Sequence, residues 1–128
     1  MDYIAGIGDD MAQDFHKEFP HFEGRRKAIH AAMRCFSNYE MRLAKRLIDG
    51  LQQLPGVKIH GVSDPAAMSR RVPTVSFTVY NDSPNVLPTH CADENIFVWS
   101  GDYYAIDIAA DLGILDSGGA VRMRSGPL

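Results

Sequence analysis

The sequence contains little of what marks several common classes of protein. Its two cysteines, Cys35 and Cys91, stand far apart with no CxxC spacing, so we expect free thiols in a reducing compartment and no disulfide. No apolar run approaches the roughly 20 residues that a membrane span needs. The first residues also lack the pattern of a secretion signal. We therefore expect a cytoplasmic protein without a membrane partner.

Positive charge is also scarce for a protein that binds nucleic acid. The 128 residues carry a formal net charge of −3, which gives no general field that attracts polyanions. Basic residues cluster between Arg25 and Arg46, but aromatic residues do not alternate with them as in a base-stacking surface. A solvated helix face explains the cluster better, and no nucleic-acid partner is expected.

Histidine, cysteine and acidic residues form no recognisable metal or catalytic set. The segment His90-Cys91-Ala92-Asp93-Glu94 contains metal-ligand types, yet on a helix only His90 shares a face with Asp93 or Glu94. One such pair is too few for a zinc site. No Ser-His-Asp or Cys-His set can be assigned either, so we predict neither a metal ligand nor a catalytic residue.

One long helix is the strongest pattern in the first half of the chain. Apolar residues recur at steps of three, four and seven from Ile29 to Leu54, between Arg25 and the stop at Pro55-Gly56. At ~1.5 Å per residue this helix would be about 45 Å long. A small domain does not cover that length, so we expect a second domain, a second chain or a kink near Ser37-Asn38. A short helix over 2–15, interrupted by two glycines, and a loop over 14–24 are expected before it.

The second half predicts a small sheet with helices packed on it. Alternating or β-branched runs predict strands, and runs of helical period predict helices. The expected strands are 57–61, 73–79, 96–99 and 120–124, and the expected helices are 86–94 and 102–112. The fold class is therefore α/β, a two-layer α+β-like sandwich whose small mixed sheet of three to four strands follows the long helix. We divide the chain into an N-terminal segment, 1–24, and a small α/β domain, 25–128.

Several short motifs stand in a specific order in this half. They are Pro73-Thr-Val-Ser-Phe77, Ile96-Phe-Val-Trp-Ser-Gly-Asp-Tyr-Tyr-Ala105, Leu112-Gly113, Gly118-Gly119 and Val121-Arg122. Together they resemble the C-terminal small domain of class V aminotransferases, specifically the cysteine desulfurase-like branch of the fold-type I pyridoxal-phosphate enzymes. The resemblance runs from about Asp2 to Arg122, and no single motif in it is unique. It implies that residues 1–24 correspond to the end of a large domain that is otherwise missing.

The resemblance also implies which cofactor parts this chain lacks. In that family the large domain supplies the Schiff-base lysine, the aspartate beside the pyridine nitrogen and the phosphate site. None of the four lysines has the flanking residues of the cofactor lysine; they are Lys17, Lys27, Lys45 and Lys58. We therefore expect no cofactor in this chain alone and no activity alone, with pyridoxal phosphate and a large domain supplied by a partner chain.

The small domain of the family contributes an arginine that binds the substrate carboxylate. Arg122 in Val121-Arg122 matches it, and a planar, two-pronged guanidinium suits a carboxylate. From the residues alone, a strand-edge charge beside Arg124 is an equally good interpretation. Tyr104 stands where the desulfurases carry their nucleophilic cysteine, so desulfurase activity is not expected. The candidate substrate-binding residues are Arg122, Tyr104, Tyr103, Trp99 and Gly101.

Two functions from different classes remain open. The first is a detached or truncated C-terminal domain of such an enzyme, catalytically incomplete alone. The second is a stand-alone α/β module for binding a small ligand or for oligomerisation. The family continues after the last strand with a closing helix, whereas this sequence stops at Leu128. Apolar sheet surface left uncovered favours self-association, so a homo-oligomer is expected.

Overall fold

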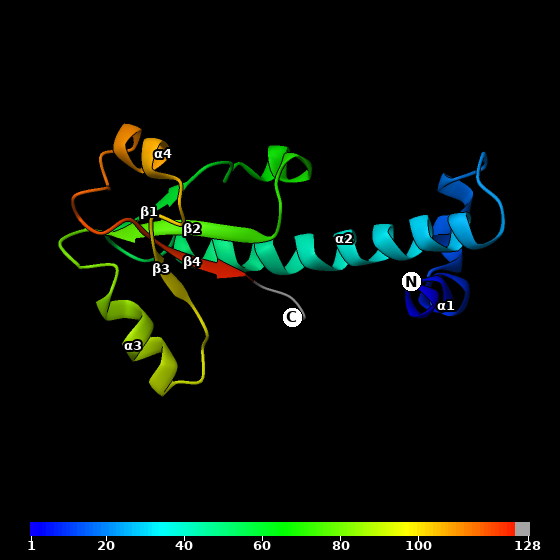
Figure 1. Cartoon of the computed structure of the whole chain (residues 1–128), viewed down its shortest axis with the longest axis horizontal. Helices are drawn as coiled ribbons and strands as arrows, with labels where there is room; N and C mark the ends of the chain where they lie inside the picture. Colours follow the sequence, from blue (N-terminus) through cyan, green and yellow to red (C-terminus); the bar gives the residue numbers. More distant parts are fainter. Residues whose placement is uncertain (125–128) are drawn as a thin grey trace. The chain divides into compact units, whose positions relative to one another are not determined.

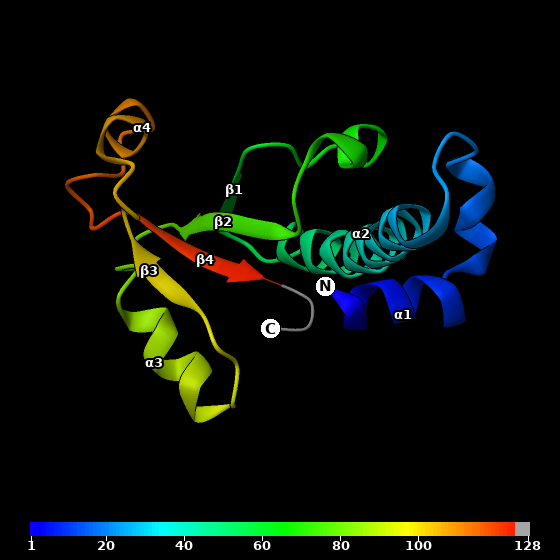
Figure 2. The ribbon, with the colours of Figure 1, turned by 45° about the vertical axis from the view of Figure 1, so that its right-hand side comes forward.

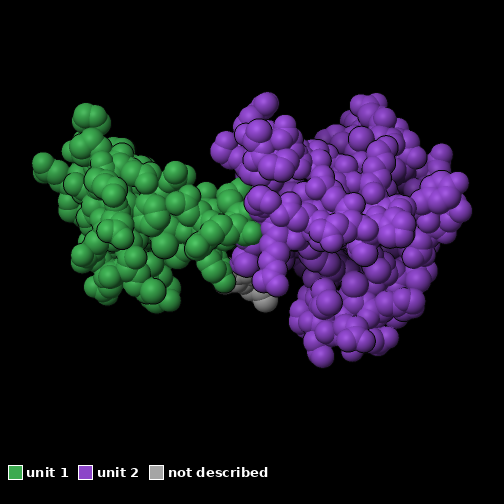
Figure 3. Space-filling model, turned by 180° about the vertical axis from the view of Figure 1, so that it is seen from behind, with its two compact units in different colours: residues 1–42 green, residues 43–128 purple. Residues whose placement is uncertain are grey.

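The computed structural model describes residues 1–124 of the chain, which forms two compact units, residues 1–42 and residues 43–128 (Figure 3). The expectation about a missing closing helix concerns 125–128, outside the described residues. Figure 1 labels the helices and strands. In chain order, with two 3-10 helices as η1 and η2, they are α1 (Asp2–Asp10), η1 (Gln13–Glu18), α2 (Gly24–Leu51), β1 (Val57–His60), η2 (Pro65–Arg70), β2 (Thr74–Val79), α3 (Val86–Asp93), β3 (Trp99–Gly101), α4 (Ile106–Asp111) and β4 (Ala120–Arg124).

The first unit packs α1 against the start of α2 through small residues. Its buried apolar side chains are alanines, three of which lie on α2: Ala28, Ala31 and Ala32. Gly8 allows the helices to touch, because a Cβ there would overlap the carbonyl of Ala28. The expectation that glycines interrupt the first helix is therefore wrong, since α1 runs through both of them to Asp10. In one case the missing side chain is what permits the packing.

The segment expected as a loop over 14–24 is partly helical and aromatic. It contains most of η1, and after η1 Phe19 and Phe22 pack on His30 of α2 with ring centroids 5.3 and 4.2 Å away. The Arg26 guanidinium lies 4.3 Å from the centroid of the Phe22 ring. These contacts hold a segment in place that the sequence pattern assigns to a loop, because it is polar and contains Pro20 and Gly24.

The second unit contains a four-stranded sheet in the order β1-β2-β4-β3. All three pairings are antiparallel, and in the central pair Ser76 lies opposite Arg122 and Phe77 opposite Val121. The expected α/β class, with a long helix before a small sheet, is confirmed. The sheet differs from the expected mixed one in being antiparallel throughout.

The two faces of this sheet have different coverings. On one face Val75, Phe77 and Val121 form the core with Ile48 and Leu51 near the end of α2. Ser76 and Arg122 alternate with these residues, so they point to the opposite face. Figure 2 shows α3 and α4 on opposite sides of the sheet. The second face, which carries Arg122, is the one that α4 approaches, because Arg122 and residues of α4 line one hollow.

The third strand and the fourth helix begin later than expected. The strand expected over 96–99 is β3, Trp99–Gly101, and the helix expected over 102–112 is α4, Ile106–Asp111. The Asp102 carboxylate accepts a hydrogen bond from the amide of Tyr104 at 2.8 Å, and Tyr103 and Tyr104 adopt φ of 58° and 62°. Such a side-chain-capped turn competes with helix formation, so the helix starts only after it.

No helix within residues 1–124 is both long enough and apolar enough to cross a membrane.

Candidate functional site

A hollow of about 350 Å³ lies in the second unit between the sheet and α4. We call it the Arg122 hollow. The sheet and the turn after it contribute mainly polar residues, while α4 and its flanks contribute apolar ones. The lining residues are His60, Gly61, Ser76, Gly101, Asp102, Tyr103, Ala105, Ile108, Ala109, Leu112, Ile114, Ala120 and Arg122.

Arg122 is the central group of this hollow. It lies on the inner strand β4, with Ser76 and Trp99 as its neighbours on the adjoining strands. Its Nε is buried and has no hydrogen-bond partner, and within residues 1–124 no carboxylate forms an ion pair with it. A buried donor without an acceptor costs about 1–3 kcal/mol, and more when it is charged. The strand therefore holds a guanidinium whose buried Nε–H has no hydrogen-bond acceptor among the described residues.

Tyr103 fixes the position of this guanidinium. Arg122 Cζ lies 3.6 Å from the centroid of the Tyr103 ring, a close cation–π contact. The Tyr103 hydroxyl donates a hydrogen bond of 3.3 Å to the carbonyl of Ala120. Burial raises the pKa of Tyr103, although the charge of Arg122 opposes the rise. The phenol thus stays protonated at neutral pH and anchors the ring beside the arginine.

The turn that carries Tyr103 depends on two glycines and a strained backbone. Gly101 has φ of 134° and Gly119 has φ of 89°, and a Cβ on Gly119 would overlap the Gly101 carbonyl. Tyr103 and Tyr104 then adopt left-handed conformations that cost ordinary residues about 1–2 kcal/mol each. The close approach of the two glycines leads the chain into the turn that presents the Tyr103 ring to Arg122.

His60 adds a second basic side chain to the lining, but not a fixed charge. Its Nε2 lies 3.2 Å from Thr78 Oγ1. Burial, and to a lesser degree the charge of Lys58, lower the pKa of His60. At neutral pH the ring is therefore neutral, and Arg122 alone carries a fixed positive charge among the described residues of the hollow.

Only part of the predicted substrate-binding set comes together. Arg122, Tyr103 and Gly101 line the same hollow. Trp99 and Tyr104 do not belong to its lining, and the two residues are 74% and 101% exposed. The turn at Asp102 sends Tyr104 outward, whereas the sequence pattern placed it within a helix.

Sequence reasoning missed several residues of the site. His60 and Ser76 lie opposite each other on β1 and β2, and Ser76 lies opposite Arg122. The alternation of polar and apolar residues indicates which residues of one strand share a face. It does not predict the register that places His60, Ser76 and Arg122 side by side on neighbouring strands. Ile108 and Leu112, on the apolar side of the hollow, were recognised only as part of a helical pattern and not as site residues.

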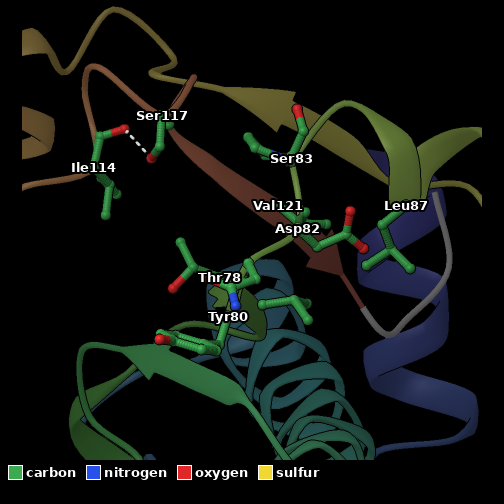
Figure 4. Close-up of a pocket in the computed structure, with 12 residues that line it drawn as sticks. Thr78, Tyr80, Asp82, Ser83, Leu87, Ile114, Ser117 and Val121 are labelled. Carbon is green, nitrogen blue, oxygen red and sulfur yellow. Dashed lines mark hydrogen bonds between the residues drawn. The ribbon is translucent and has the colours of Figure 1, made fainter.

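A second hollow of about 520 Å³ lies where β2 ends, and Figure 4 shows the residues that line it. It is formed by residues 78–84 with Leu87, Ile114, Ser117, Gly119 and Val121. Ser117 Oγ donates to the carbonyl of Ile114 at 2.9 Å, so that hydroxyl is already engaged. Asp82 is the charged residue of this lining. It offers an anionic ligand no basic side chain among the described residues.

The lysines do not fit a pyridoxal-phosphate site. Lys17, Lys45 and Lys58 are exposed and Lys27 is half-buried, and none lines either hollow. Lys45 is moreover paired with Asp49 at 2.5 Å. An imine lysine needs a desolvated pocket that lowers its pKa. The described positions of the four lysines therefore do not match the surroundings of an imine lysine.

Within residues 1–124 no group of three or more histidine, cysteine and acidic side chains is arranged to hold a metal ion. Cys35 and Cys91 are both free and half-buried.

Comparisons with known proteins place these features in context. No protein-family model and no curated protein matches the sequence. Among solved structures, the chain is similar to the apo cysteine desulfurase of Thermococcus onnurineus NA1, with 28% identity and a TM-score of 0.62. The match covers 79% of this chain but only 24% of that one, so the chain spans about a quarter of its structural neighbour. This similarity supports a partial domain of the cysteine desulfurase family.

Proposed function

We propose that the chain is a C-terminal-type domain of a pyridoxal-phosphate-dependent, class V aminotransferase-like protein, and that it contributes Arg122 to bind a substrate carboxylate. The observation that carries this proposal is the guanidinium of Arg122, which lies beside Tyr103 in a hollow. Its Nε is buried, and no carboxylate within residues 1–124 pairs with it. A charged side chain in that state is suited to a planar carboxylate. The similarity to part of a cysteine desulfurase supports the same assignment.

The chain's own residues would bind and orient a substrate and would not carry out the covalent chemistry. In the parent family the cofactor supplies an electron sink for reactions at the carbon next to the substrate amine. Here Tyr103 holds Arg122 in place, and Tyr104 stands where the desulfurases carry their cysteine. We therefore propose that the domain needs a partner polypeptide with a large cofactor domain, and that it lacks desulfurase activity.

A stand-alone binding module is the second candidate function. The Arg122 hollow favours it, because the hollow is bounded within residues 43–128 and already combines one cation with an apolar wall. Tight binding of a small anion by the isolated chain would support the module. Weak binding, together with completion of a site by a partner, would support the detached domain.

Self-association stays a prediction of the sequence. Light scattering at high protein concentration tests it, and a clean monomer there would contradict it.

The carboxylate role of Arg122 can be tested directly by NMR. A buried Nε–H exchanges slowly with water, so its cross-peak should be visible at neutral pH, and its loss in Arg122→Gln assigns it. Acetate added at constant ionic strength should shift this peak in a saturable way. Chloride at the same concentration is the control for a general salt effect. A peak that responds equally to acetate and chloride would refute the proposed carboxylate site.

A further inference from the structure

We propose that the Arg122 hollow selects monocarboxylates with a short aliphatic chain, and that Ile108 and Leu112 form the wall that receives the chain. This inference rests on the proposed carboxylate role of Arg122 and adds the class of ligand. It concerns the residues of α4 and its end, which the carboxylate role does not use.

The apolar wall is exposed without an evident structural purpose. Ile108 is 63% exposed and Leu112 is 40% exposed, yet both line the hollow beside the buried Ala109. Residues four apart on a helix share a face, so Ile108 and Leu112 present a continuous apolar strip. An aliphatic ligand would cover this strip and remove its surface from water.

The charges of the hollow restrict the other end of the ligand. Arg122 is its one fixed cation among the described residues, because His60 is neutral at neutral pH. Asp102 also belongs to the lining, with Oδ1 held by the Tyr104 amide at 2.8 Å. A single guanidinium balances one carboxylate, whereas a second negative charge would have no cation and would meet Asp102. This set therefore favours a monocarboxylate over a phosphate ester or a dicarboxylate.

The size of the hollow agrees with such a ligand. Its volume of about 350 Å³ lies at the lower end of the range of roughly 300–1,000 Å³ that is usual for small-molecule sites. Full burial of one methylene improves affinity about fourfold. Because the wall stays partly open, we expect about two- to fourfold per methylene.

The experiment measures how affinity depends on chain length in the full chain. Acetate, butyrate and hexanoate are titrated at constant pH and ionic strength, with the Arg122 Nε–H cross-peak as the readout and hexylammonium as a control of opposite charge. Two variants are matched: Ile108→Asn changes the wall, while Ile106→Asn changes a residue of α4 that is 55% exposed but outside the hollow. Circular dichroism and thermal melts check that both variants fold.

The expected result is a rise in affinity from acetate to hexanoate of about 16- to 250-fold, from two- to fourfold at each of four methylenes. Ile108→Asn should flatten this rise, and Ile106→Asn should behave like the unmodified chain. Should Ile108→Asn fail to fold, Leu112→Asn takes its place with the same expectation.

The outcomes separate this inference from the one on which it rests. Equal affinity for all three carboxylates would overturn the aliphatic selection while leaving the carboxylate site intact. A similar loss in both isoleucine variants would also overturn it, because the effect would not come from the hollow. No carboxylate-specific response of the Arg122 peak would instead refute the carboxylate role itself.

Discussion

Two glycines on α1 should respond in opposite ways to the same substitution. Glycine in a helix interior costs about 0.8–1.0 kcal/mol relative to alanine. A Cβ at Gly6 meets nothing within 4 Å, so Gly6→Ala should gain nearly that amount. A Cβ at Gly8 would overlap the backbone of Ala28, which cannot rotate away as a side chain can. Overpacking costs about 1–3 kcal/mol, and an overlap with rigid backbone belongs at the upper end of that range, so after the gain in propensity Gly8→Ala should lose up to about 2 kcal/mol.

Amide hydrogen exchange along α1 measures this difference where it arises, because exchange reports the local opening of a helix. Gly6→Ala should raise protection about fivefold, and Gly8→Ala should lower it by up to about thirtyfold. The second unit serves as an internal control, since its amides should not change. Equal increases in both variants would refute the close packing of Gly8 on Ala28.

Three further predictions concern the second unit. Burial and the charge of Lys58 lower the pKa of His60 in the folded chain. As the pH falls, the unfolded chain therefore binds the proton first, and the free energy of unfolding should fall from about pH 7 toward pH 5. Urea denaturation of His60→Gln should show a smaller fall, and a pH profile equal to that of the unmodified chain would contradict this. Tyr104 is fully exposed with φ of 62°, so Tyr104→Gly should stabilise by up to about 1 kcal/mol through relief of strain, whereas Tyr104→Ala should not. Phe77→Ala should cost about 3–5 kcal/mol and Phe97→Ala under about 0.5 kcal/mol, because the two rings are 3% and 84% exposed; similar midpoints in thermal melts would count against the assigned core.

The architecture was largely predictable because its periodicities are strong. The stripe from Ile29 to Leu54 predicts α2 to within a few residues of its observed end at Leu51. The β-branched run after Pro73 likewise predicts β2. The spacing of apolar residues indicates which face of a helix or strand is buried, and both α2 and β2 bury one face.

The errors lie where local side-chain bonds or glycine packing override periodicity. The Asp102 carboxylate builds a turn where apolar spacing indicated a helix, and that turn carries Tyr104 out of the site. At Gly8 the chain uses glycine for contact rather than for a break. Neither effect can be predicted without knowing which group each residue contacts, the Tyr104 amide for Asp102 and the Ala28 backbone for Gly8.

The candidate site was predictable in its central residue and not in its surroundings. The resemblance pointed to Arg122 and to the matched stretch that contains Gly101 and Tyr103. His60 and Ile108 come from segments far apart in the sequence, and only strand register and helix placement bring them to one hollow. The wall that we propose to select the ligand therefore required the structure.

Reaction with pyridoxal phosphate tests most directly whether this chain can hold the cofactor by itself. The purified chain is mixed with the cofactor, its visible absorbance is recorded, and borohydride reduction with mass mapping locates any imine; free lysine at matched concentration is the control for non-specific reaction. We expect weak adducts spread over the exposed amines, among them Lys17, Lys45 and Lys58. A stable absorbance band that maps to one lysine would contradict it, because the chain would then carry its own cofactor site.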